Sequence, residues 1–124
     1  PEGFNFDEFF ENIVDFGFVQ QNTKYMNNYE YNRTIYLLNK EEGLLDNNFL
    51  ILRRNESALS SPVGVLYYDF YTDKEKVEKE IKQKSESIQC VVGKEGIKFG
   101  ETQIPKLWEY ADNVNTLKFL VTLL

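Results

Sequence analysis

The order of elements in residues 64–92 constrains the fold most. Residues 64–71 form an apolar run that predicts a strand, and Thr72–Glu75 is a capping box that begins a highly charged helix. Residues 88–92 then predict another strand. Strand, helix and strand in this order form a βαβ unit, in which a right-handed crossover joins two parallel strands. We therefore expect an α/β fold with a small, mainly parallel sheet flanked by helices.

Two further helices are expected before this unit. Asn5 is placed to cap a helix over residues 6–15, with Glu8 three residues later. Residues 25–38 carry tyrosines at helical spacing. These tyrosines either pack in the core with their hydroxyls at its rim or form a ligand surface, and core packing is the preferred interpretation.

The remaining segments predict shorter elements. Residues 45–48 have the composition of a turn, and residues 49–52 predict a short buried strand. The glycine-containing residues 93–104 predict a loop, and Pro105 can begin a short helix. Apolar residues recur at helical spacing over residues 114–124.

Composition limits the classes of function. With 124 residues, a net charge of −6 and 42% hydrophobic residues, the sequence is typical of one globular domain spanning residues 1–124. The acidic balance argues against nucleic-acid binding, which depends on clustered Lys and Arg. No apolar run approaches the ~18 residues of a membrane span, and no signal peptide is visible, so we expect a cytoplasmic protein.

The chemistry available to this chain is narrow. It has no histidine and one cysteine, which excludes an internal disulfide, the usual zinc ligand sets and any dyad of histidine with cysteine or serine. Cys90 lies in the apolar stretch 88–92 without a cationic neighbour, so we expect a buried, structural thiol. No glycine-rich phosphate loop is present. We therefore expect neither a catalytic residue nor a metal site here.

Several blocks, in order, resemble the terminal part of acyl-CoA reductases of the bacterial fatty-acid-reductase type, which belong to the aldehyde dehydrogenase superfamily. The resemblance runs from about residue 24 to the end and rests on residues 25–32, 45–50, 59–68, 88–92, 99–103 and 107–112. It implies a partial aldehyde-dehydrogenase-like catalytic domain. The chain would then be the C-terminal segment of a longer enzyme and inactive alone.

The resemblance also implies a reaction and a site. Enzymes of this family reduce fatty acyl-CoA to aldehyde with NADPH or NADH, through a cysteine that would lie before this segment. Glu56 occupies the position of the glutamate that binds the nicotinamide ribose. Phe99 and Gly100 occupy that of the loop that closes the catalytic domain, and the resemblance implies that they too bind the cofactor. Glu56 precedes Pro62 by six residues rather than the superfamily's four, and Lys98 replaces the proline before Phe-Gly.

Two alternatives remain at this stage. Glu56 is either a cofactor ligand or an ordinary loop carboxylate ahead of a buried strand. The whole chain is either this enzyme segment or a stand-alone acidic interaction domain, of the inhibitor or immunity type, that binds a basic partner through its Phe and Tyr residues. A segment of a larger domain would expose apolar surface, so a homo-oligomer is also expected. The sequence does not indicate the acyl chain length or the choice between NADH and NADPH.

Overall fold

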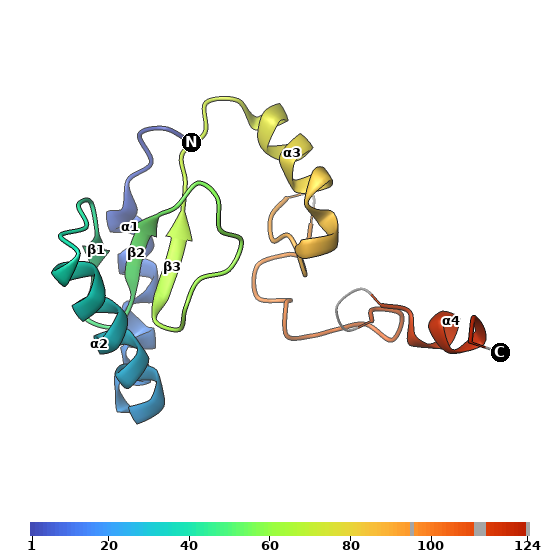
Figure 1. Ribbon diagram of the computed structural model, residues 1–124, viewed down its shortest axis with the longest axis horizontal. Helices are drawn as coiled ribbons and strands as arrows, with labels where there is room; N and C mark the ends of the chain where they lie inside the picture. Colours follow the sequence, from blue (N-terminus) through green and yellow to red (C-terminus); the bar gives the residue numbers. More distant parts are fainter. Residues whose placement is uncertain (95, 111–113, 124) are drawn as a thin grey trace. The chain divides into compact units, whose positions relative to one another are not determined.

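The computed structural model describes residues 1–94, 96–110 and 114–123 (Figure 1). The chain forms two compact units, Pro1–Lys74 and Glu75–Leu124. The first unit contains helices and a small sheet, which confirms the mixed α/β class. The expectation of a single domain stays a prediction.

The first helix begins where its cap predicts. The side chain of Asn5 accepts a hydrogen bond from the backbone nitrogen of Asp7 (2.9 Å), and helix α1 follows at Phe6–Ile13. It ends two residues earlier than expected and continues as a 3-10 helix, η1, at Val14–Gln21. The cap is a local signal, so the sequence predicts the start of this helix better than its end.

Helix α2, at Thr23–Leu38, matches the expected helix closely. Asn22 caps it by accepting from the backbone nitrogen of Tyr25 (3.1 Å). Tyr29 and Tyr36 are buried on one side of the helix and pack with Ile51 of the sheet. These two tyrosines therefore belong to the core, which confirms for them the preferred interpretation of core packing.

The sheet has three short strands in the order β1-β2-β3, with β1 at Leu45–Asp46, β2 at Ile51–Arg54 and β3 at Val65–Tyr68. Strands β1 and β2 are antiparallel, whereas β2 and β3 are parallel. The sheet is therefore mixed. Strand β2 is displaced from the expected residues 49–52, because the side chain of Asn47 accepts from the backbone nitrogens of residues 49 and 50 (3.2 and 2.8 Å) and holds them in a turn.

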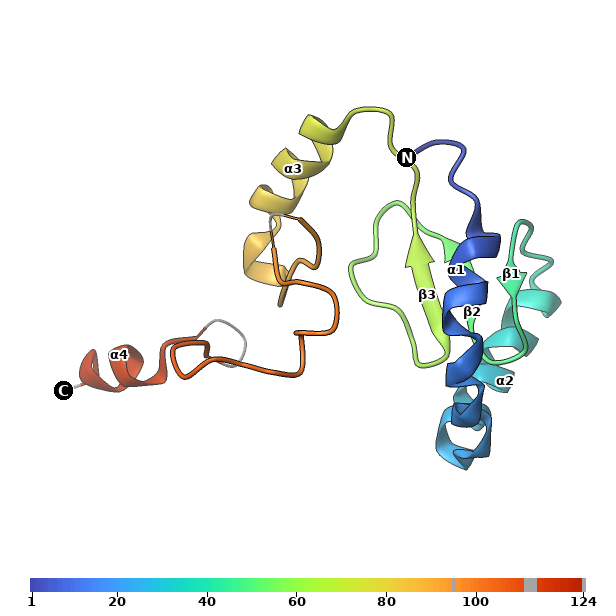
Figure 2. The same ribbon diagram turned by 180° about the vertical axis from the view of Figure 1, so that it is seen from behind.

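The two helices cover opposite faces of this sheet (Figures 1 and 2). Ile51 and Val65, which are partners in the register, pack in the cluster that includes the tyrosines of α2. Leu52 points to the other face and is fully buried, at 0% exposed. On that face the ring of Phe6 in α1 lies 4.6 Å from the ring of Tyr68. The first unit therefore has three layers, with the sheet between α2 and α1.

Residues 55–64 join the parallel strands without a helix. They run beside β3, from the end of β2 back to the start of β3 (Figure 1). Parallel strands are usually joined through a helix. Here the loop has its own contacts: the hydroxyl of Ser61 donates to the carbonyl of Val65 (2.7 Å), and the buried amide of Asn32 donates to the carbonyl of Val63 (3.3 Å). These contacts tie the loop to β3 and α2.

Gly64 is required at the end of this loop. Its φ is +80°, and a Cβ there would lie 2.9 Å from Cα and Cβ of Tyr29. Such a distance is far inside van der Waals contact, and the partner is helix backbone rather than a flexible side chain. The absence of a side chain at Gly64 therefore allows α2 to lie directly on the start of β3.

The second unit contains helix α3 from the boundary, Lys74–Gln83, the short 3-10 helix η2 at Ser85–Ser87, and helix α4 at Thr116–Val121. The prediction of a strand at residues 88–92 is wrong. Val92 makes only an isolated parallel bridge with Ile97, so the expected βαβ unit is not formed. An apolar run becomes a strand only where an adjacent strand supplies hydrogen-bonding partners.

The remaining expectations for the second unit are met in part. Residues 93–104 form a loop where the structure describes them, and Pro105 precedes a turn rather than a helix. Helix α4 lies within the expected residues 114–124, although Leu124 is outside the described residues, as are residues 111–112 of the last resembling block. Within the described part of the chain, no helix combines the length and the apolar character needed to cross a membrane.

Candidate functional site

The carboxyl ends of β2 and β3 form the first candidate site. Arg54 ends β2 opposite Tyr68, which ends β3, and the backbone nitrogen of Asn55 donates to the carbonyl of Tyr68 (2.9 Å) to close the ladder. Open α/β sheets typically bind ligands just beyond the carboxyl ends of parallel strands. Glu56 follows directly, so the sequence-predicted ligand residue lies at this end of the parallel pair.

Asn55 fixes the loop on which Glu56 lies. Its side-chain oxygen accepts from the backbone nitrogens of Ser57 (3.0 Å) and Ala58 (2.9 Å), and from the hydroxyl of Ser57 (3.2 Å). An asparagine side chain that bonds the backbone two and three residues ahead stabilises a turn in the way that a helix cap does. The backbone of Glu56 is therefore held between β2 and this turn.

Arg54 holds the carboxylate of Glu56 from one side. A terminal nitrogen of its guanidinium lies 2.9 Å from Oε1 of Glu56, and Nε lies 3.1 Å from Oδ1 of Asp69. The guanidinium carbon is 5.7 Å from the centre of the Phe70 ring. The hydrogen bond to Asp69 is the main cause that raises the pKa of Arg54, against a smaller opposing effect of desolvation.

The charge of this group determines which ligand it suits. One arginine with two carboxylates leaves one net negative charge, and the side chains of Arg54, Glu56 and Asp69 are 54%, 69% and 40% exposed. Such a group repels phosphate and accepts hydrogen bonds from hydroxyl groups. A sugar hydroxyl fits it, and a phosphate does not.

Phe99 and Gly100 lie in the second unit, whereas Glu56 lies in the first. Phe99 is 86% exposed, and Gly100 has a φ of +82° in the turn that follows. The backbone nitrogen of Glu101 donates to the carbonyl of Lys98 (3.1 Å) and closes this turn. Phe99 and Gly100 therefore lie in an exposed tight turn.

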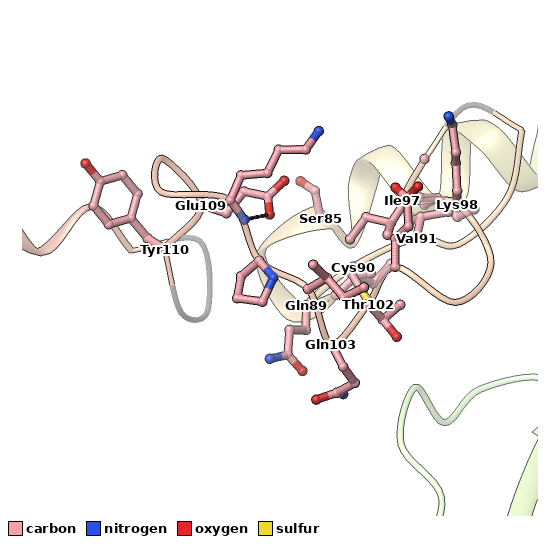
Figure 3. A pocket seen from close by; sticks show the side chains of 17 residues that line it. Ser85, Gln89, Cys90, Val91, Ile97, Lys98, Thr102, Gln103, Glu109 and Tyr110 are labelled. Carbon is pink, nitrogen blue, oxygen red and sulfur yellow. Dashed lines mark hydrogen bonds between the residues drawn. The ribbon is translucent and has the colours of Figure 1, made fainter.

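The second unit also contains a pocket of about 870 Å³ (Figure 3). Its walls come from the end of α3, from residues 85–91 and from residues 96–110. Lys98 and Glu101, on either side of Phe99 and Gly100, line it. Polar side chains at the wall include Gln89, Cys90 and Thr102. No signal in the sequence predicted this pocket, because the segments that line it were expected to be a strand and a loop.

Cys90 is exposed, which corrects the expectation of a buried thiol. That expectation depended on the strand at residues 88–92, and without the strand no sheet covers the side chain. The thiol instead lines the pocket of the second unit.

Arg54 and Asp69 are the site residues that the sequence analysis missed. They come together through the alignment of β2 with β3, which depends on register and so on tertiary structure. The turn at Asn55 was open to prediction, because asparagine before a small polar residue is a common turn signal.

In the described residues no group of three or more acidic or cysteine side chains could hold a metal ion. Comparisons of the chain with family models, with curated proteins and with solved structures found no match.

Proposed function

We propose that this chain is the C-terminal part of a nicotinamide-dependent enzyme that reduces fatty acyl-CoA thioesters to aldehydes, with Glu56 as the ligand of the nicotinamide ribose. The ordered blocks between residues 25 and 112 support the proposal from the sequence. The observation that carries it in the structure is the position of Glu56, exposed beyond the carboxyl end of a parallel strand pair and held there by Arg54.

The chemistry divides between this chain and an upstream part. In the proposed reaction the acyl group passes from the CoA sulfur to a cysteine outside this chain, with release of the CoA thiol, and the aldehyde leaves after reduction. A bound nicotinamide would supply the hydride. Within this chain, Glu56 orients the ribose by accepting hydrogen bonds from its hydroxyls.

The local charge supports a ribose rather than a phosphate at Glu56. The net negative charge of the group formed by Arg54, Glu56 and Asp69 favours neutral hydroxyl donors. A charged acceptor of this kind contributes to binding and orientation and does not itself transfer a proton. Because Glu56 lies near the ribose in this proposal, its removal should affect cofactor affinity and hydride transfer and leave acylation of the cysteine unchanged.

Glu56→Gln in the full-length protein tests the proposal. We expect nicotinamide affinity or the single-turnover rate of hydride transfer to fall about tenfold or more, since a hydrogen bond to a charged group is worth roughly 1.5–3 kcal/mol. Glu42→Gln, which alters another exposed carboxylate of the first unit, is the matched control and should change neither quantity. If Glu56→Gln and the unaltered protein have equal cofactor affinity and equal rates of hydride transfer, Glu56 is only a solvated loop residue.

A second candidate, the acidic interaction domain, is favoured by the distribution of charge. Residues 75–124 contain as many Lys and Arg as Asp and Glu, so the net charge of −6 belongs to the first unit. An acidic unit of this kind suits a basic partner. The reading frame upstream of residue 1 separates the candidates: the enzyme requires a nucleotide-binding region and a cysteine there, and the interaction domain requires a nearby start codon.

A further inference from the structure

We infer that Arg54 is a positioning residue, anchored by Asp69, that holds the carboxylate of Glu56 in the orientation required to bind a sugar hydroxyl. The inference rests on the proposed function and adds two residues to it. It concerns the arrangement of Arg54 between two carboxylates from different strand ends, which the resemblance does not include.

The side chain of Arg54 packs on aromatic rings. Its guanidinium carbon lies 5.7 Å from the centre of the Phe70 ring, which in turn packs edge-on against Tyr68 at 5.4 Å between ring centres. Phe6 of α1 contacts both rings, at 6.2 and 4.6 Å. A guanidinium that lies on an aromatic face loses much of its rotational freedom. The direction of Arg54 is therefore set by the packing of α1 on the sheet.

Different nitrogens of the same guanidinium engage the two carboxylates. Nε contacts Asp69 (3.1 Å), and a terminal nitrogen contacts Glu56 (2.9 Å). Because the guanidinium is planar and rigid, fixing one side of it also fixes the direction of the other. Asp69 directly follows β3, so the sheet determines where Arg54 presents its second nitrogen. Glu56, the more exposed of the two carboxylates, is the one presented to a ligand.

Arg53, the adjacent arginine, has a structural role in this sheet. Arg53 points to the opposite face and lies over the ring of Tyr36 (4.7 Å). It makes two hydrogen bonds to Glu41, and both side chains are about three-quarters buried. Arg54 and its partners are much more exposed, and exposed ion pairs add little to folding stability. Stability therefore accounts for Arg53 and does not account for the arrangement around Arg54.

A double-mutant cycle in the full-length enzyme tests this role. The variants are Arg54→Gln, Glu56→Gln and the double variant, and the measurements are the dissociation constants of NADPH and NADH and the single-turnover rates of acylation and hydride transfer. We expect Arg54→Gln to weaken cofactor binding about threefold to tenfold. If Arg54 acts only through Glu56, it has no further effect once Glu56 is replaced. Acylation should be unchanged throughout.

Two more variants examine the geometry of the contact. Asp69→Asn should weaken binding in the same direction as Arg54→Gln and by a smaller factor, since it removes the anchor and keeps the guanidinium. Arg54→Lys should restore only part of the loss, because an ammonium keeps the charge and lacks the planar fork. Arg33→Gln is the matched control. Arg33 is 50% exposed and pairs with Asp46 through Nε (2.8 Å), away from Glu56, so cofactor binding should not change.

The outcomes separate the inference from the proposed function. A loss with Glu56→Gln and none with Arg54→Gln would overturn the positioning role and leave the function of Glu56 intact. Losses that add in the double variant would show that Arg54 contacts the ligand itself, which also contradicts the inference. No loss with Glu56→Gln would overturn the assigned site itself. Thermal unfolding of each variant, compared with the unaltered protein, would show whether a loss of fold accounts for any effect.

Discussion

At the scale of single residues, Asp46 is the centre of the hydrogen bonding in the first unit. Its carboxylate accepts from the hydroxyl of Tyr29 (2.8 and 3.0 Å to its two oxygens), from Nε of Arg33 (2.8 Å) and from the backbone nitrogen of Asn48 (2.8 Å). Burial, followed by the hydrogen bond to Asp46, raises the pKa of Tyr29 above the ordinary tyrosine value of 10.0. The hydroxyl of Tyr29 is thus a stabilising donor only while it keeps its proton.

Tyr29→Phe should lower the free energy of unfolding by about 1–3 kcal/mol near neutral pH, because it removes a hydrogen bond to a charged acceptor. The contribution of Tyr29 is fully present below pH 10. Above pH 10 the unfolded chain releases the tyrosine proton first, so this contribution is lost as the pH rises toward the raised pKa of the folded state. The difference between the two proteins should therefore shrink above pH 10.

Urea unfolding at several pH values measures this difference. Tyr31→Phe, at an exposed position of the same helix, is the control and should change little. A constant difference between Tyr29→Phe and the unaltered protein up to pH 12 would contradict the assignment of the bond.

Cys90 provides a second prediction at this scale. Because the thiol is exposed, iodoacetamide should modify it in the native protein at close to the rate seen in denaturant. Cys90→Ala in the full-length enzyme should leave acylation and hydride transfer unchanged, since the proposed nucleophile lies elsewhere. Modification only after unfolding would restore the buried thiol, and loss of acylation in Cys90→Ala would make Cys90 the nucleophile.

At the scale of elements, the approach of α2 to the start of β3 is the most demanding contact in the first unit. Gly64→Ala should destabilise the protein by about 2–4 kcal/mol, because it adds overpacking against Tyr29 to the cost of a positive φ. Gly43→Ala is a matched control. Gly43 has a φ of +72°, and a Cβ there would meet nothing within 4 Å, so the substitution should cost only about 1 kcal/mol.

Chemical denaturation of the two glycine variants therefore separates steric overlap from backbone strain. We expect a clearly larger loss of unfolding free energy for Gly64→Ala. Equal losses would mean that α2 does not lie directly on β3.

Sequence patterns predicted the helices that depend on local signals. They failed for a strand that depends on a pairing strand elsewhere in the chain. The cap at Asn5 and the tyrosine spacing located α1 and α2, because both signals act within a few residues. The strand at residues 88–92 failed since its apolar pattern says nothing of an available strand partner. For the candidate site, the choice of Glu56 comes from its sequence context and stays a prediction. Its contacts with Arg54 and Asp69 depend on the register of β2 and β3, which the sequence does not specify.

At the scale of the whole molecule, charge is distributed unequally, and exposed apolar side chains, which occur in both units, are dense toward the end of the chain. The first unit carries the net negative charge, and the described residues from 99 to 123 include many large apolar side chains that are exposed. They are Phe99, Ile104, Leu107, Trp108, Val114, Leu117, Phe119, Leu120, Val121 and Leu123. Exposed apolar surface of this kind usually marks a region that another protein surface covers.

Residues 1–124 alone should therefore associate as their concentration rises. Sedimentation equilibrium should show a dimer or larger assembly, and Leu107→Ser combined with Trp108→Ser should weaken it. Leu38→Ser, which replaces an exposed leucine of α2, is the control and should have a smaller effect. A monomer at every concentration would argue against an apolar contact surface in the second unit.

We propose that this chain completes an acyl-CoA reductase, and the stoichiometry of the reaction in the full-length protein tests this proposal. Adding a fatty acyl-CoA together with NADPH or NADH should consume the reduced cofactor and release aldehyde and CoA thiol in equal amounts. Residues 1–124 alone should be inactive. Absence of thioester-dependent cofactor oxidation across short and long acyl chains, with both cofactors, would contradict the account.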